Sequence, residues 1–444
     1  MYQPITATQL GIIRILLVGA LAYTINELLL PIEPFPREFH LTVHQLSNLE
    51  WVHALAAMPQ AVDWLQTAIF ALMFIFAVGF FTRLAFVALV MALTVWTLVR
   101  LTHTGAHSWS VMLVALWAML PVRWGDGFSL DARLGRARPD ARHGMNYGWT
   151  IWAPGLVFGT AMWGAGVAKL LDAGTAWITN GTVKYHFVTD AGSAPTDWGL
   201  WVAAHHRVAV FLSAIGVFTE LSLIVAVLLT SYLARLPFAL AGLGLLIGFY
   251  VFQNEIWAAW WTLFLMFFIP WPHLLPRGRT PVSNERLLPI PLVVVTAVIV
   301  ALQVIATAER VELSPLMSDY PMYSSTYASI EEFERSAGLR TTYKFQATFE
   351  DGSTTDASDH LGPQGEPLRD TYLGLTGQRQ LPEAASKIPS AAIGQLSTRL
   401  GRPVVALHVL VDQRGFNWDT GQMEWRARDK PVWVFTRDGR SSPP

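Results

Sequence analysis

The chain has 444 residues and a formal net charge of −1, and 52% of its residues are hydrophobic while only 14% are charged. This balance favours a protein that lies largely in a membrane. It contains no cysteine, which excludes disulfides, thiolate metal sites and cysteine nucleophiles. No nucleic-acid, nucleotide or metal motif stands out along it.

The charged residues are unevenly distributed. More than half of them lie between Glu309 and the end of the chain. We therefore expect an α-helical membrane bundle over residues 1–308 and a small soluble domain over residues 309–444.

The first 308 residues contain nine apolar stretches of the length or near the length that a membrane span needs, which is roughly 20 residues. The fourth and eighth are short, and either could be a tilted or partly buried helix. The nine expected spans are Leu10–Leu30, Leu65–Phe81, Leu84–Leu101, His107–Val122, Trp149–Leu171, Val208–Ser231, Leu236–Phe252, Ile256–Trp271 and Leu288–Thr307.

Arginines cluster after the even-numbered spans, which predicts that those spans end in the cytoplasm. With nine spans, the N-terminus is then cytoplasmic and the C-terminal domain extracytoplasmic, in a multi-pass protein of the plasma membrane. The arginines concerned are Arg133, Arg136, Arg138, Arg142, Arg235, Arg277, Arg279 and Arg286.

The C-terminal region has the pattern of a small α+β domain. Pro315–Tyr323 reads as a linker, and Thr341–Thr354 alternates as a hairpin around Asp351 and Gly352. Val404–Val411 and Val432–Thr436 are β-branched strand candidates, with a helix near Ser390–Leu400.

Polar residues in the expected spans collect toward the outer side of the membrane. Lys169 and Asp172 share one helical face, as do His103 and His107 if their helix starts early enough. The outer group also includes Gln253, Asn254 and Glu255, and Glu27 could join it. The candidate substrate- or cofactor-binding residues are His103, Asp172, Trp177, Glu220, Gln253, Asn254 and Glu255. Glu220 lies in mid-span, and Arg14, in the inner half of the first span, is the only cation at a comparable depth. A buried charge at such depth normally needs a partner.

Each of these residues also has a structural interpretation. Lys169 alone could extend to the interface, Asp172 could end a helix, and His103 could be an interfacial histidine. The segment from Gln253 to Glu255 could be a polar turn, and His205 and His206 a loop pair before a span. Glu220 is either functional or structurally paired.

Four short motifs occur in the order and spacing of a known family. They are Ala106-His107-Ser108-Trp109, Ser129-Leu130-Asp131, Ala165-Gly166-Val167-Ala168-Lys169-Leu170, and Trp177 with Gly181 behind it. Over about Thr8–Arg277 the chain resembles the vitamin K-dependent gamma-carboxylases and their bacterial relatives with the horizontally transferred transmembrane domain.

The resemblance implies that Lys169 is a base toward a reduced quinone and that His107 supports the reaction. In those carboxylases a lysine at the matching position acts on a reduced naphthoquinone, and reaction with oxygen then produces a stronger base that prepares a glutamate side chain for carboxylation. The matching pocket opens away from the cytoplasm, in agreement with the arginine pattern.

The chain also departs from that family. It has Ala168-Lys169 where the carboxylases have two lysines, Phe249–Asn254 where they have a histidine-containing segment, and a shorter C-terminal region. Two function classes stay open. One is a membrane enzyme with Lys169 and His107 as catalytic residues, acting on a secreted or membrane-associated peptide or protein. The other is a non-enzymatic assembly, immunity or export partner with the same bundle.

Overall fold

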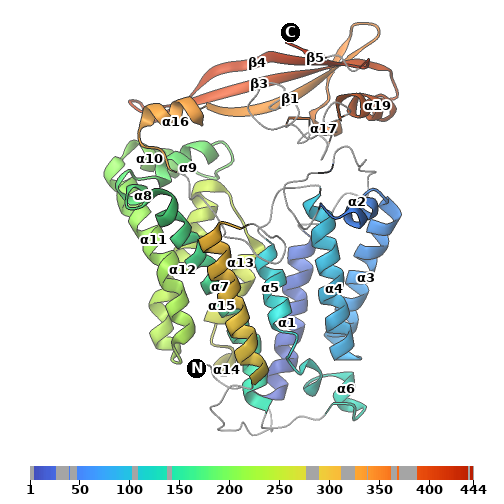
Figure 1. The fold of residues 1–444 in the computed structure, drawn as a ribbon, viewed down its shortest axis with the longest axis vertical. Coiled ribbons are helices and arrows are strands. Elements are labelled where there is room, and N and C mark those ends of the chain that lie inside the picture. The colour runs from blue at the N-terminus through green and yellow to red at the C-terminus, as the bar shows by residue number, and fades with distance from the viewer. Residues whose placement is uncertain are drawn as a thin grey trace.

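The structure is a computed structural model with a helical bundle below a β-sheet domain (Figure 1). It describes residues 5–26, 40, 48–102, 109–137, 143–276, 290–311, 326–337, 339–361, 368–369, 388–438 and 441–443. Several expectations concern residues outside these ranges: His103, His107, Glu27, the linker Pro315–Tyr323, and Arg138, Arg142, Arg277, Arg279 and Arg286.

Within the described ranges, seven helices are long and apolar enough to cross a membrane. This supports a multi-pass membrane protein, because each of them exceeds the length needed to cover most of a bilayer core. They are α1 (Ala7–Asn26), α3 (Pro59–Val78), α4 (Thr82–Leu101), α7 (Gly144–Ala173), α11 (His206–Leu228), α12 (Tyr232–Gln253) and α15 (Ile290–Glu309).

The fourth and eighth expected spans are not full-length helices. They form α5 (Ser110–Ala118) and α13 (Ala258–Phe268), which extend about 14 and 16 Å at 1.5 Å per residue, about half a bilayer core. Each ends shortly before a proline, Pro121 or Pro270, that cannot continue a helix. Both pack against α7 inside the bundle (Figure 1).

Short helices lie at the two ends of the bundle. At the end that faces the sheet are α2 (Glu50–Ala56), α8 (Ala176–Thr179), α9 (Val183–Asp190) and α10 (Trp198–Ala204) (Figure 1). The opposite end carries the start of α1, α6 (Leu130–Arg133), α14 (Trp271–Leu274) and the 3-10 turn η3 (Trp124–Asp126).

The long helix α7 is the centre of the bundle, and its glycines let neighbouring helices approach closely. A Cβ added at Gly155 would lie 2.1 Å from the ring of Phe267 on α13, and one at Gly166 would lie 3.2 Å from the Cβ of Glu220 on α11. Small residues at such crossings allow close van der Waals packing in membranes. Gly166 therefore lets α11 bring Glu220 close to α7.

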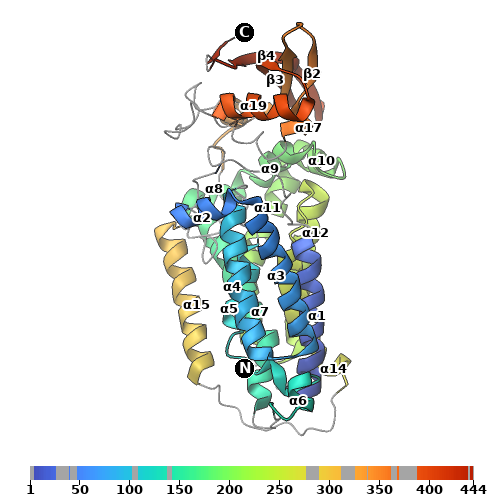
Figure 2. The same ribbon diagram turned by 90° about the vertical axis from the view of Figure 1, so that its right-hand side faces the viewer.

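The C-terminal domain is an antiparallel sheet with helices on the face toward the bundle (Figure 2). Its strand order is β2-β1-β3-β4-β5, formed by β1 (Leu339–Phe349), β2 (Thr354–Asp356), β3 (Val404–Asn417), β4 (Gln422–Thr436) and β5 (Ser441–Ser442). The helices of this domain are α16 (Ile330–Ser336), α17 (Ser358–Leu361) and α19 (Ile388–Leu400).

The expected strands and helix of this domain are confirmed. β1 and β2 pair with Thr348 opposite Thr354, and Gly352 in their turn has φ +79°, a conformation that favours glycine. The strands expected from Val404 and up to Thr436 extend into the β3–β4 hairpin, and α19 covers the expected helix.

An aromatic cluster joins the bundle to the sheet domain. Tyr185 of α9 packs with Tyr327 and with Phe333 of α16, and with Phe416 and Trp418 from β3 and the turn after it. These side chains fasten α9 to α16 and to the β3–β4 hairpin.

Candidate functional site

Two charged side chains pair inside the bundle. The Nζ atom of Lys169 donates to both carboxylate oxygens of Glu220, at 2.9 and 2.8 Å. Lys169 on α7 is 3% exposed and Glu220 on α11 is 2% exposed. Glu220 therefore faces the bundle and has the partner that a buried charge at its depth normally needs. Its partner is Lys169, which the sequence analysis had placed nearer to the interface.

The simple interfacial interpretation of Lys169 is wrong, because the bundle continues beyond the end of α7. Trp177 on α8 is itself buried, and its ring lies 5.4 Å from the Lys169 Nζ atom, within the range of a cation–π contact. With α8 and α9 packed above this position, the amine cannot reach water by extending along its helix.

Arg14, the cation that the sequence offered as a partner for Glu220, serves the other end of the bundle. Its Nη1 donates to the carbonyl oxygen of Trp124 at 2.7 Å, and its Nη2 to that of Phe128 at 2.7 Å. Weaker contacts reach Gly127 and Ala77. Carbonyl dipoles thus replace water around this fully buried charge.

The Lys169–Glu220 pair forms part of the wall of an apolar cavity of about 370 Å³. Most of the lining comes from α11 and α12, through residues such as Leu212, Ile215, Leu245 and Phe249. An apolar cavity with a few polar groups at one end is the usual form of a small-molecule site. The polar side chains of the lining are Lys169, Glu220, Trp177, His186, Thr219 and Gln253.

The cavity extends to the outer surface of the bundle between α11 and α12. Gly216 and Gly244 line it, and a Cβ built at either glycine would have no neighbouring atom within 4 Å. Beside them, Ile215 is 45% exposed and Leu240 is 61% exposed. Since these exposed side chains are apolar and lie on helices long enough to span a membrane, this opening would face the hydrocarbon core in a bilayer.

Of the polar segment Gln253–Glu255 at the end of α12, one residue reaches the cavity. Gln253 lines it and donates through Nε2 to Asp190 Oδ2 at 2.7 Å. Asn254 is exposed and ends α12 in the left-handed conformation, with φ 61°. Glu255 accepts a hydrogen bond from Trp257 Nε1 at 2.8 Å. Asn254 and Glu255 therefore fit the polar-turn interpretation.

Asp172, three residues after Lys169, is directed to another partner. Its Oδ2 lies 2.7 Å from Arg310 Nη2 at the end of α15. The pair is about one-third exposed, so it fastens α15 to the end of α7 and does not line the cavity.

Two residues of α9, between the fifth and sixth expected spans, are not among the site residues predicted from the sequence. His186 lines the cavity opposite α11 and α12. Lys184 is buried at the aromatic cluster, where its Nζ lies 3.4 Å from His206 Nδ1 and 4.7 Å from the Tyr185 ring centre. Burial lowers the pKa of Lys184. The available signal was a lysine and a histidine among aromatic residues in a segment too short to span.

Comparisons with family models, curated proteins and solved structures find no match to this chain. No group of three or more His, Asp or Glu side chains in the described ranges could hold a metal ion.

Proposed function

We propose that this protein is a membrane enzyme in which Lys169 acts as a base toward a lipid-soluble aromatic molecule, with a reduced quinone as the first candidate. The observation that carries the proposal is the buried Lys169–Glu220 pair in the wall of an apolar cavity that opens between two spanning helices. The resemblance of the surrounding motifs to the vitamin K-dependent carboxylases points to the same lysine.

The pair has the properties that proton exchange in a dry site requires. Lys169 is a base only without its extra proton, and Glu220 is the group in contact that can receive that proton. Burying charged groups in a low dielectric costs free energy. The ionised pair is therefore closer in free energy to a neutral amine beside a protonated carboxyl than it would be in water. Glu220 can then take a proton from Lys169 before a substrate hydroxyl approaches.

The cavity fits a flat ring with an apolar tail. Phe249 and Phe252 supply aromatic surface, and the glycines between α11 and α12 leave room for a chain that extends into lipid. When bound, a reduced quinone supplies an acidic hydroxyl and two electrons. The protein's part is to receive the proton at Lys169, to orient the ring with Gln253 and Trp177, and to exclude water with α8 and α9.

The proposed orientation puts the sheet domain outside the cell. Arg123, Arg133, Arg136 and Arg235 all belong to the end of the bundle away from the sheet, which the excess of positive charge assigns to the cytoplasm. A groove of about 540 Å³ lies between α10 and the β3–β4 hairpin, with Asp197 and Arg414 in its lining. There a secreted peptide or protein substrate would find complementary charge.

We expect a reporter enzyme that is active only outside the cytoplasm to be active when it is fused to the C-terminal end. The sheet domain and the start of α1 lie at opposite ends of the bundle, so a reporter at the N-terminus should be inactive. Activity of the N-terminal fusion alone would reverse the orientation.

Blocking the lateral opening should prevent binding. We expect Gly244→Leu and Gly216→Leu to weaken binding of a reduced naphthoquinone about tenfold or more, because filling packed or ligand-occupied space costs about 1–3 kcal/mol. Saturable binding to the protein in lipid nanodiscs is the measurement.

Gly19→Leu is the matched control. Gly19 is also an exposed glycine on a spanning helix, with no atom within 4 Å of a built Cβ. It should bind like the unmodified protein. Equal affinity in all three variants would remove the lateral site from the proposal, and absence of binding to the unmodified protein would remove the quinone.

A further inference from the structure

A second cavity lies at the opposite end of the bundle from Lys169. It has a volume of about 740 Å³ and is lined by residues at the start of α4, in η3 and around α6. Unlike the first cavity it is rich in charge, with Arg83, Arg123 and Arg136 beside Thr82, Asp126 and Asp131.

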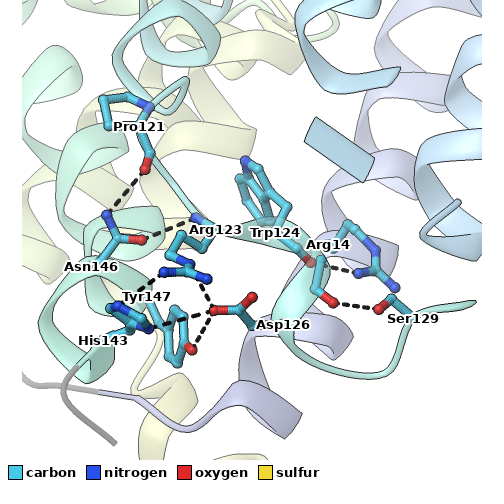
Figure 3. Close-up of polar contacts among 10 residues, drawn as sticks. Arg14, Pro121, Arg123, Trp124, Asp126, Ser129, His143, Asn146 and Tyr147 are labelled. Carbon is cyan, nitrogen blue, oxygen red and sulfur yellow. Dashed lines mark hydrogen bonds and ion pairs between the residues drawn. The ribbon is translucent and has the colours of Figure 1, made fainter. Parts of the chain in front are cut away.

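The loop that forms one wall of this cavity is firmly held. Arg14 binds its carbonyl group at Trp124, and Ser129 donates to the carbonyl group of Gly125 (Figure 3). Arg14 also binds the carbonyl group of Phe128. A Cβ at Gly127 would lie 1.7 Å from the carbonyl oxygen of Ala7 on α1, so only glycine allows this contact. The arginine-lined wall is therefore built before any ligand arrives.

Asp126 is occupied by partners from the protein itself. Its Oδ2 accepts from Tyr147 Oη at 2.7 Å and lies 3.1 Å from Arg123 Nε (Figure 3). Arg123 is further positioned by His143, whose Nε2 is 3.1 Å from its Nη1, and by Asn146, which accepts from its backbone N–H. Burial raises the pKa of Asp126 despite these contacts.

Asp131 is also engaged. It accepts from the backbone N–H and the hydroxyl of Thr82 at 2.7 and 2.6 Å, and from the backbone N–H of Phe81 at 3.1 Å. Arg136 Nη1 lies 3.9 Å from Asp131 Oδ1, and the guanidinium carbon of Arg136 lies 4.5 Å from the ring centre of Phe81. With one arginine for each carboxylate, Arg83 leaves the lining with an excess positive charge.

The same cavity continues onto apolar surface. Leu84 and Val87 line it on α4 and are 69% and 39% exposed. A ligand that satisfies both parts carries an anionic group at the arginines and hydrocarbon along α4. Arginine is well suited to phosphate, because its guanidinium offers several donors in a planar fork.

We propose that this cavity binds the phosphate group of an anionic phospholipid, with the acyl chains lying along Leu84 and Val87. The site lies at the end of the bundle where a lipid headgroup layer would meet the loop from η3 to α6. It is independent of the Lys169 cavity and of the reaction proposed there.

The test is thermal unfolding of the purified full-length protein in detergent, with phosphatidylglycerol, phosphatidylcholine or inorganic phosphate added in separate arms. We expect phosphatidylglycerol to raise the midpoint most. For Arg83→Gln and Arg136→Gln, the shift in midpoint is measured against the lipid-free midpoint of the same variant. The apparent affinity of each for phosphatidylglycerol should be about fivefold lower, as expected for the loss of one positive charge near anionic lipid.

Arg133→Gln is the control, because Arg133 is an exposed arginine of α6 that lines a different surface hollow. It should respond like the unmodified protein, and native mass spectrometry should show it retaining phosphatidylglycerol. An equal loss in Arg133→Gln, or an equal effect of phosphatidylcholine, would overturn the site. An equal effect of inorganic phosphate would support phosphate recognition and overturn the lipid as its source.

Discussion

Lys169→Arg is expected to abolish conversion of a reduced naphthoquinone while the protein stays folded. Arginine keeps the positive charge and can still pair with Glu220, but it cannot lose its proton in a protein and so cannot act as a base. The measurement is oxygen-dependent loss of the reduced naphthoquinone in nanodiscs, above the rate in empty nanodiscs.

Lys169→Ala should be equally inactive. Both variants should still bind the naphthoquinone, which would show that their inactivity does not come from a collapsed cavity. Gly19→Leu supplies the active control with an altered spanning helix. Conversion at the full rate by Lys169→Arg would assign the buried lysine an electrostatic role and remove it as the base, whereas no conversion by the unmodified protein would favour the non-enzymatic membrane partner.

The Lys169–Glu220 pair should also control stability in a way that single and double variants distinguish. Removing one partner leaves a charge in the bundle without its counter-ion. We expect Lys169→Met or Glu220→Leu alone to lower the free energy of unfolding by about 3–5 kcal/mol. Denaturant titration of the purified protein measures this.

The double variant Lys169→Met with Glu220→Leu should recover most of that loss, since well-packed apolar residues replace a buried ion pair at little or no cost. It should nevertheless remain without conversion activity. Additive losses in the double variant would contradict the pairing as the source of the single-variant effects.

Prediction from the sequence was most successful where physical constraints leave a segment only one or a few possible conformations. Long apolar stretches such as Val208–Ser231 predicted helices because a bilayer leaves few alternatives. Asp351 and Gly352 predicted a turn because only a short list of residues adopts left-handed φ at low cost. Hydropathy did not distinguish α5 and α13 from full spans, because short apolar segments pack inside a bundle as readily as they cross a membrane.

Partners in space were harder to predict than partners along the chain. Lys169 and Glu220 are 51 positions apart on different helices, and nothing local to either residue names the other. The sequence predicted Lys169 near the interface and Glu220 in mid-span. It did not predict that α8 and α9 cover the end of α7 and bury Lys169. For the same reason Arg14 was considered for Glu220, although four backbone carbonyl groups surround it instead.

The short helix α9 contacts both the sheet domain and the cavity beside Lys169, which couples binding at these two places. Tyr185 of α9 packs against Trp418 of the sheet domain, while His186 and Phe187 of the same short helix line the membrane cavity. Any molecule whose binding to the sheet domain shifts α9 changes the affinity of the cavity for its ligand. By thermodynamic linkage, a ligand in the cavity then changes the affinity of the sheet domain for its own ligand by the same factor. Binding at either site would therefore depend on whether the other site is occupied.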